Sequence, residues 1–298
     1  MITVNLPNGK LYTVKNFSAS QLKQIKTCAK RWELMRVQYI PWKNNIYLVR
    51  GRNFHTVMEH MHLHMFENRN NLPDLEQLLE MSEEGLRADV TPDLIPIPKK
   101  RAKKDADYTD QEYKALKLQE LIDTSAELIK QVYSNVDYEV SGVEISAPII
   151  WHDLPFEARV DLVINRGGKN VLVDHKTKSV DDHAVDLTQY STYLKCLREH
   201  KYPLEEAEQW DSIFTAKPVF KVVKLDMHEI ENGIKLLDED LANSFKLIQA
   251  GIFTRNEYHS TCKIDRCPVW DLCRNPDKIE EFRDDTPYHT EVTGLNIV

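Results

Sequence analysis

The sequence has no run of about 18 apolar residues, so it predicts no transmembrane helix. Its first residues, Met1 to Pro7, show no basic head followed by an apolar stretch, so we expect no signal peptide and a cytoplasmic protein. Cysteine is scarce, with five residues, an odd number for a disulfide framework. In a chain without a visible export signal, such a framework is not expected, and metal or redox roles for the thiols gain weight.

Basic residues are also fewer than acidic residues. Lys and Arg number 39 against 47 Asp and Glu, which gives the 298-residue chain a net charge of −8. This balance argues against indiscriminate binding of polyanions over the whole surface, but it is compatible with a local basic groove. The contents of 42% hydrophobic and 29% charged residues are those of a globular protein, and they exclude a wholly disordered, collagen or coiled-coil chain.

The first part of the chain reads as a hairpin followed by helices. We expect the hairpin over residues 1–14, and hydrophobic periodicity predicts helices over about 18–37, 51–68, 74–88 and 111–134. Residues 91–110 interrupt the pattern with three prolines and a basic run, which consists of Lys99, Lys100, Arg101, Lys103 and Lys104. This run is either a solvated linker or an arm that contacts phosphates.

The middle of the chain reads as a sheet. Three segments rich in Val, Ile and aromatic residues predict strands over 138–151, 156–165 and 170–173, the last two joined by a Gly-Gly turn as antiparallel neighbours. A helix, a strand and a long helix are expected to follow, over about 184–198, 219–225 and 226–250. This order predicts a mixed α/β (α+β) fold with a central sheet flanked by helices.

We expect one continuous domain over residues 1–298. Its three parts would be an N-terminal hairpin and helical part, a catalytic sheet core, and a C-terminal helix with a cysteine-rich segment, over 1–135, 136–225 and 226–298.

Two carboxylates lie on neighbouring predicted strands. Asp161 is inside one apolar strand, and Asp174 ends the next one, two residues before Lys176. Because side chains alternate along a strand, Asp174 and Lys176 point to one face and His175 to the other. Adjacent carboxylates repel unless a cation lies between them, and oxygen ligands suit Mg²⁺ or Mn²⁺. Taken alone, however, the Asp-x-Lys pattern also fits a salt bridge at a strand end.

Four motifs occur together in a fixed order. They are His55 on an early helix, Asp161 in a strand, the run Asp174-His175-Lys176-Thr177, and Gln189 with Tyr193 on a following helix. In this order they resemble the PD-(D/E)XK nuclease superfamily, and in particular its RecB-like branch. The resemblance covers residues 18–273 or so, and His175 is a departure from the residues common at that position.

The resemblance implies a restriction-endonuclease-like fold and a metal-dependent DNA nuclease that hydrolyses phosphodiesters with a metal-activated water. His55, Asp161, Asp174 and the backbone carbonyl of His175 would bind the divalent ion, and Lys176 would be the catalytic lysine. The same resemblance favours an exonuclease acting on single-stranded DNA or DNA ends, with recombination, repair or replication proteins as candidate partners. The rival class is a non-catalytic DNA-binding or assembly subunit that retains the fold.

Two side chains on one helix face complete the implied site. Gln189 and Tyr193 are four residues apart, so they share a face, where the resemblance has them border the site and help to position DNA. The alternative is two ordinary helix-surface residues. Basic side chains elsewhere are candidate phosphate contacts besides the basic run, namely Arg31, Arg36 and Lys178.

Four of the five cysteines form a second pattern. Cys262, Cys267 and Cys273 lie close together, and Cys28 is far away along the chain. Three close thiolates and one remote thiolate can complete a four-thiolate site. In the RecB-like branch such a set forms an iron–sulfur staple, so the resemblance implies a 4Fe–4S cluster in a C-terminal iron–sulfur segment, with zinc or plain buried thiols as alternatives. Cys196 reads as a core thiol.

Overall fold

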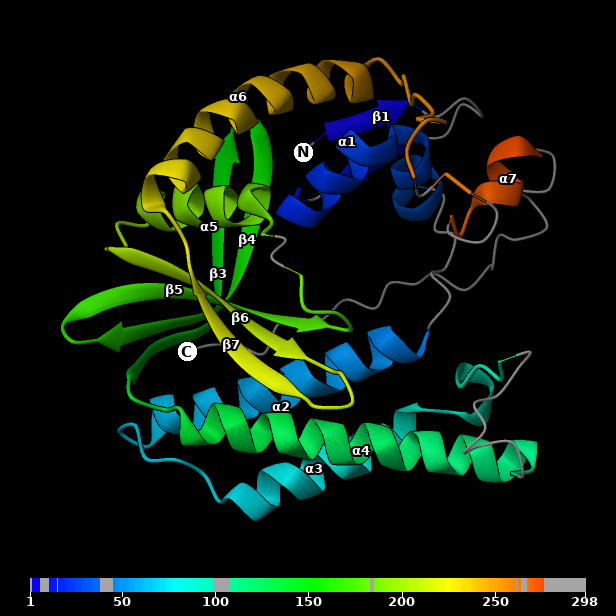
Figure 1. The fold of residues 1–298 in the computed structure, drawn as a ribbon. Helices are drawn as coiled ribbons and strands as arrows, with labels where there is room; N and C mark the ends of the chain where they lie inside the picture. The colour runs from blue at the N-terminus through cyan, green and yellow to red at the C-terminus, as the bar shows by residue number, and fades with distance from the viewer. Residues whose placement is uncertain are drawn as a thin grey trace. The chain divides into compact units, whose positions relative to one another are not determined.

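The structure is a computed structural model, which describes residues 2–5, 11–14, 16–37, 45–98, 108–182, 185–260, 262–263 and 267–275 (Figure 1). Its helices are α1 (Ala19–Trp32), the π-helix η1 (Glu33–Val37), α2 (Ile46–Glu67), α3 (Leu75–Asp89), the 3₁₀ turn η2 (Pro92–Leu94), α4 (Asp110–Ser134), α5 (Leu187–Glu199), α6 (Met227–Gln249) and α7 (Trp270–Arg274). Its strands are β1 (Ile2–Asn5), β2 (Leu11–Val14), β3 (Glu139–Trp151), β4 (Leu154–Arg166), β5 (Lys169–Lys178), β6 (Glu206–Ile213) and β7 (Val219–Lys224).

The chain divides into two compact units. One comprises residues 1–43, 150–156 and 236–298, and the other comprises residues 44–149 and 157–235. In the described part of the chain, no helix is long and apolar enough to cross a membrane.

A five-stranded mixed sheet is the centre of the fold. Its strand order is β3-β4-β5-β6-β7, in which β5 and β6 are parallel and the pairs β4–β5 and β6–β7 are antiparallel. Gly167 and Gly168 have φ of +60° and +82°, which a two-residue hairpin turn between β4 and β5 requires. The mixed sheet with flanking helices confirms the predicted fold class, and β1 and β2 pair as the predicted N-terminal hairpin.

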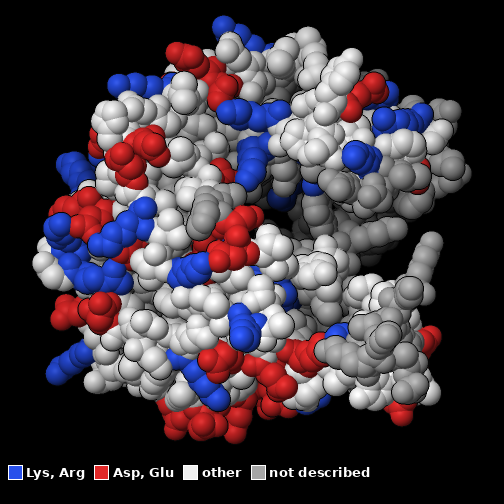
Figure 2. Space-filling model, in the orientation of Figure 1, with Lys and Arg blue, Asp and Glu red and all other residues white. Residues whose placement is uncertain are grey.

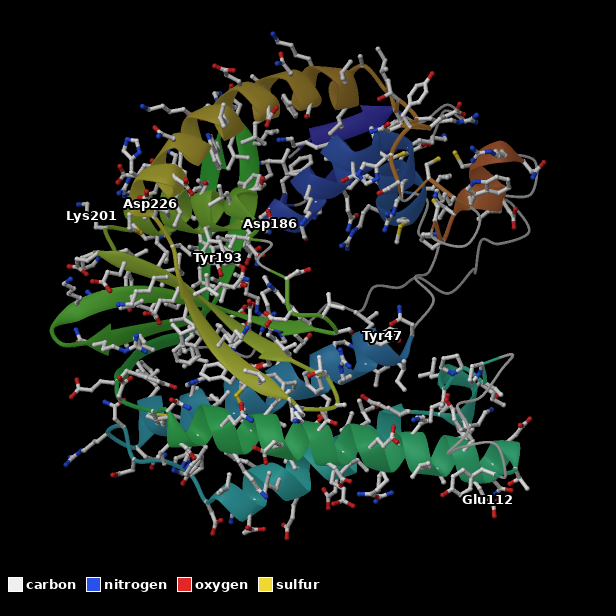
Figure 3. All side chains as sticks on the ribbon, in the orientation of Figure 1. Tyr47, Glu112, Asp186, Tyr193, Lys201 and Asp226 are labelled. Atoms are coloured by element: carbon white, nitrogen blue, oxygen red, sulfur yellow. The ribbon has the colours of Figure 1, made fainter. Side chains whose placement is uncertain are left out.

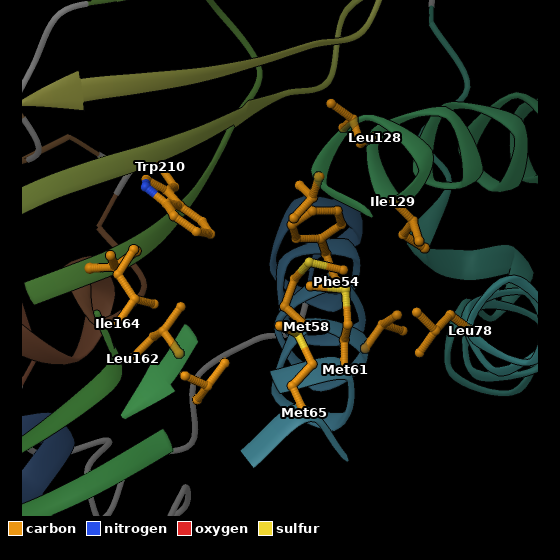
Figure 4. Packing of buried hydrophobic residues seen from close by; sticks show 14 of the residues in the cluster. Phe54, Met58, Met61, Met65, Leu78, Leu128, Ile129, Leu162, Ile164 and Trp210 are labelled. Atoms are coloured by element: carbon orange, nitrogen blue, oxygen red, sulfur yellow. The ribbon is translucent and has the colours of Figure 1, made fainter. Parts of the chain in front are cut away.

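Helix α2 is buried on two sides, between the sheet and the helices α3 and α4 (Figure 4). Phe54, Met58, Met61 and Met65 of α2 are each at most 1% exposed in this core. They pack with residues of α3, α4, β4 and β6, among them Leu78, Leu128, Ile129, Leu162, Ile164 and Trp210. This packing holds α2 firmly on the sheet.

Helix α2 also approaches β5 closely at Gly51. A Cβ atom built there would lie 2.8 Å from Thr177 Oγ1, so a glycine lets the two backbones approach. The helix starts at Ile46, five residues earlier than predicted, because the Asn45 side chain caps it by accepting from Leu48 N at 2.9 Å. His55 is thereby presented from the middle of a rigid helix.

The sequence analysis was wrong about one central strand and about the end of another. It missed β6, all of which except Glu206 is buried, although Glu208, Gln209, Asp211 and Ser212 are polar. It also ended β5 at residue 173, whereas the strand runs on to Lys178 because β6 pairs with it from Val171 to Lys178. The residues Asp174 to Lys178 therefore lie within a strand.

Candidate active site

Two aspartates lie opposite each other on the β4–β5 hairpin. Leu162 pairs with Val173 in the antiparallel register, so Asp161 and Asp174 are the next opposed pair. The backbone N–H of His175 donates to Asp161 Oδ2 at 3.0 Å. Asp174 is 1% exposed, whereas 19% of the Asp161 side chain remains exposed. The hairpin thus holds the buried carboxylate of Asp174 next to the partly exposed carboxylate of Asp161.

The electrostatics of this pair favour a bound cation. Burial raises the pKa of Asp161 well above its usual value, and the charge of Asp174 raises it further. Burial also raises the pKa of Asp174, while the nearby Lys176 ammonium lowers it. Two repelling carboxylates are hard oxygen donors, so the donor set fits Mg²⁺ or Mn²⁺.

The complete ligand set stays a prediction. In the part of the chain that the structure describes, no group of three or more His, Cys, Asp or Glu side chains is arranged to hold a metal ion. His55 Nδ1 nevertheless lies 3.8 Å from Asp161 Oδ2, on the side of the site that α2 faces. Burial and then the charge of Lys176 lower the pKa of His55 to about 4, so its imidazole is neutral near pH 7 and has a lone pair to offer.

Lys176, Gln189 and Asp174 form a connected network. Lys176 Nζ lies 2.5 Å from Asp174 Oδ2 and donates to Gln189 Oε1 at 2.8 Å. Gln189 Nε2 in turn donates to Asp174 Oδ1 at 2.8 Å, so one amide bonds both charged groups. The hydroxyl of Tyr193, one turn later on α5, is within 2.5 Å of Gln189 Nε2 and 3.4 Å of Asp174 Oδ1 (Figure 3). Both α5 residues therefore lie at the site rather than on an outer surface.

The side chain of His175 points to the opposite face of β5, as the alternation along the strand predicts. It is 3% exposed, and its ring packs within 5.4 Å of the His62 ring and 5.2 Å of the Trp210 ring. Neither ring nitrogen has a hydrogen-bond partner in the described structure, and burial lowers its pKa well below the usual value. His175 is thus a neutral core side chain behind the site.

Glu144 of β3 is a third carboxylate of this region. It has a positive φ of +48°, and its side chain, 22% exposed, is paired with Arg159. Burial raises its pKa, and its charge adds to the rise in the pKa of Asp161. Glu144 is therefore coupled electrostatically to the Asp161 carboxylate.

A sequence model of the PD-(D/E)XK nuclease superfamily matches residues 16–274, which is most of the chain. The chain belongs to the PD-(D/E)XK nuclease superfamily. The match spans all four motifs on which the resemblance was based, from His55 to Tyr193. Membership makes the chain a nuclease-fold protein, for which DNA is the expected partner class.

Solved structures show more distant similarity. A protein from Eubacterium rectale proposed to be an exonuclease has 10% sequence identity and a TM-score of 0.47, over 83% of this chain and 87% of that one. The protein SSO0001 has 16% identity and a TM-score of 0.31, over 67% and 95% of the two chains. No curated protein matches the sequence significantly.

The four predicted cluster cysteines line a single pocket in the unit that contains α1 and α7. Cys28, Cys262, Cys267 and Cys273 share it with basic side chains that include Arg31, Arg255 and Arg274. Cys28 has non-helical angles, φ −167° and ψ 103°, inside α1, and this break in the helix accompanies its place in the pocket. Burial raises the pKa of Cys267 and Cys273, and the Cys28 thiol adds to both shifts.

The four thiols thus share one pocket, and the iron–sulfur cluster on them stays a prediction. All four are free thiols, and within the described residues they too do not form a ready metal site. Cys196 is fully buried elsewhere, and burial raises its pKa to about 12, in agreement with a core thiol.

The candidate phosphate contacts have different outcomes. The basic run of Lys99, Lys100, Arg101, Lys103 and Lys104 lies outside the described residues. Lys178 is paired with Asp211 at 2.9 Å and Asp182 at 3.0 Å, and only 12% of its side chain is exposed. Two carboxylates already pair with its ammonium, and its role as a phosphate contact stays a prediction. Arg31 lines the cysteine pocket, and Arg36 is exposed.

Proposed function

We propose that this chain is a divalent-metal-dependent deoxyribonuclease of the RecB-like branch, acting as an exonuclease on single-stranded DNA or DNA ends. The observation that carries the proposal is the group of Asp161, Asp174 and Lys176 on adjacent strands. The pKa values of both aspartates are raised by burial, which is the environment that a bound cation would relieve.

Each residue has a role that follows from its surroundings. A divalent ion held by His55, Asp161, Asp174 and the His175 carbonyl would polarise the phosphate and lower the pKa of a water. Lys176 places a positive charge where negative charge develops on the phosphate oxygens. Gln189 keeps that ammonium and Asp174 in a fixed relation, because it bonds both.

The rival function is a DNA-binding or assembly subunit without catalysis. A scaffold would have no need to bury two repelling carboxylates beside a lysine, because such burial costs free energy of folding. The intact network of Lys176, Gln189 and Asp174 therefore favours an enzyme.

The preference for DNA ends rests on the resemblance of the motifs, and one experiment tests it. Purified protein is incubated with Mg²⁺ or Mn²⁺ and with linear or circular single-stranded DNA of the same sequence. The proposal expects loss of the linear DNA alone, with EDTA stopping the reaction. Cleavage of the circle would mean an endonuclease, and no cleavage of either would favour the non-catalytic subunit.

We also propose that Cys28, Cys262, Cys267 and Cys273 hold an iron–sulfur cluster, with zinc as the alternative occupant. Support comes from their shared pocket, since cluster ligation requires four converging thiolates. The division into a helical part, a catalytic core and a cysteine-rich segment within one nuclease domain belongs to the same proposal.

A further inference from the structure

Arg50 of α2 carries a buried charge that has no acidic partner in the part of the chain that the structure describes. The residue is 7% exposed, and none of the described carboxylates forms an ion pair with it. Basic and acidic side chains are interspersed over the face of the molecule that Figure 2 shows, and exposed cations of the same unit as Arg50 form ion pairs. Examples are Lys169 with Glu206, Arg198 with Glu231, and Lys221 with Asp181. Arg50 differs from these cations in both burial and partner.

Aromatic rings and one hydroxyl hold the guanidinium. Its central carbon lies 4.0 Å from the ring centroid of Phe214 and 5.4 Å from that of Tyr47. Nη2 donates to Ser179 Oγ at 3.0 Å, while the buried Nε has no acceptor among the described residues. Burial lowers the pKa of Arg50 to about 10, so the group is still charged near pH 7. The side chain is thus fixed in place, and its Nε–H donor has no acceptor among the described residues.

A buried cation that has no acidic partner among the described residues is suited to bind an anion from outside the chain. Burying an unpaired charge is costly, and a guanidinium offers donors in a planar fork that matches phosphate oxygens. The rings of Phe214 and Tyr47 fix the plane of that fork, so little freedom is lost when a phosphate binds. The chemistry therefore points to a phosphate ligand.

The position of Arg50 relative to the active site suggests which phosphate. On α2, Arg50 precedes His55 by five residues, a rise of about 7.5 Å. Its partner Ser179 follows Lys176 by three residues along the chain. Both relations connect Arg50 with the two elements that carry the active site, α2 and the end of β5, so the ligand would be a phosphate of the DNA strand that reaches this site.

Tyr47 supplies a surface for a base beside that phosphate. It is 59% exposed at the N-terminal end of α2 (Figure 3), although it is a large aromatic side chain. Bases stack on exposed aromatic rings with little regard to sequence, and such rings combine with cationic side chains in sites for single strands.

We propose that Arg50 and Tyr47 form a subsite that binds one phosphate and stacks one base of a single DNA strand, beside the active site. This inference rests on the proposed function, because it takes the substrate to be DNA running past Asp174 and Lys176.

Binding of a fluorescent single-stranded oligothymidylate, measured by anisotropy at several salt concentrations without divalent metal, tests the subsite. Arg50→Met should weaken binding and lower the slope of log affinity against log salt by about 0.7, the value for one lost phosphate contact on a single strand. Tyr47→Ala should weaken binding about fivefold or more with the slope unchanged, and Tyr47→Phe should bind like the wild type. Arg69→Met is the matched control, an exposed arginine just after the other end of α2.

Thermal unfolding of the same variants separates this role from a structural one. If Arg50 only stabilises the fold, Arg50→Met lowers the melting temperature and leaves the salt slope at the wild-type value, which overturns the subsite. If Arg50→Met does not fold, Tyr47→Ala decides, because that exposed ring is not needed for the core. Wild-type affinity in Tyr47→Ala would then overturn the proposal.

A parallel cleavage assay keeps the two proposals distinguishable. Wild-type cleavage of DNA combined with unchanged binding in Arg50→Met and Tyr47→Ala rejects the subsite alone. A reduced salt slope in Arg50→Met without any cleavage by the wild type supports the subsite and rejects the nuclease.

Discussion

Gln189 joins the lysine and the buried aspartate, because its amide accepts from Lys176 and donates to Asp174. We expect Gln189→Ala to reduce cleavage about 10- to 100-fold, as is typical when a group that orients a metal ligand is lost. DNA affinity should stay close to that of the wild type, because the amide does not need to contact DNA for this role. Single-turnover cleavage and equilibrium binding, measured on the same preparation, separate the two effects.

The control for this variant is Lys195→Ala, which removes an exposed ion pair with Glu199 from the same helix. It should cleave at the wild-type rate. Wild-type cleavage by Gln189→Ala as well would show that the network has no part in catalysis.

Asp174 is almost completely buried and is one of the two proposed carboxylate ligands. Its pKa is raised by burial, so the ionised form opposes folding when no metal is bound. We expect Asp174→Asn to raise the melting temperature of metal-free protein, while Mg²⁺ or Mn²⁺ raises that of the wild type only. Differential scanning fluorimetry with and without EDTA measures both. A wild-type melting temperature that does not respond to either metal would contradict the assigned ligand set.

At the scale of elements, the close packing of α6 on α5 supports the network. A Cβ atom built on Gly233 of α6 would collide with Ser191 Oγ, which donates to Ile230 O at 2.8 Å. We expect Gly233→Ala to destabilise the protein by about 1–3 kcal/mol through overpacking, and to lower activity by displacing the helix that carries Gln189. Urea unfolding measures the loss of stability.

The double variant Gly233→Ala with Ser191→Ala provides the control. Removing the Ser191 hydroxyl makes room for the new methyl group, so the two substitutions should be less harmful together than their sum. If the losses of stability in the two single variants simply add in the double variant, the contact between residues 233 and 191 is not the cause of the destabilisation.

Elements also show what could be predicted from the sequence. The strands β4 and β5 were found because they are apolar and joined by Gly167 and Gly168, whose positive φ the turn requires. Strand β6 was missed because several of its buried side chains are polar. They are stabilised by hydrogen bonds and ion pairs, so the strand lacks an apolar pattern. Glu208, fully buried, accepts from Arg166 at 2.7 Å and from Trp210 Nε1 at 2.9 Å. Arg166 lies 42 residues before Glu208 in the chain, so local patterning does not reveal this partner.

The same distinction applies to the site. The sequence predicted one site from residues that each belong to a recognisable motif, in an order typical of the superfamily. These residues are His55, Asp161, Asp174, Lys176 and Gln189. Arg50 belongs to no such motif, and its significance appears only when Phe214 and Ser179 are seen around it. The ion pair of Lys178 could not be predicted either, since its partner Asp211 lies on the unpredicted strand.

At the scale of the whole molecule, the cysteine pocket links the two ends of the sequence. A cluster on Cys28, Cys262, Cys267 and Cys273 should give anaerobically purified protein a brown colour, broad visible absorbance and stoichiometric iron. Cys28→Ser should lose iron and stability, because metal binding and folding are coupled. Cys196→Ser should keep its iron, since that thiol is buried elsewhere. Stoichiometric zinc without iron would replace the cluster by a zinc site, and the absence of both metals would reject a metal-bound staple.

The most direct test of the nuclease assignment is cleavage of end-labelled single-stranded DNA by the wild type, Asp174→Ala and Lys176→Ala in Mg²⁺ or Mn²⁺. We predict cleavage by the wild type and a loss of about 100-fold or more in each variant, with DNA binding and folding retained. Lys201→Ala, at an exposed lysine in the turn after α5, should cleave normally. Cleavage by either site variant at the wild-type rate would contradict the assignment of Asp174 and Lys176 to the reactive centre.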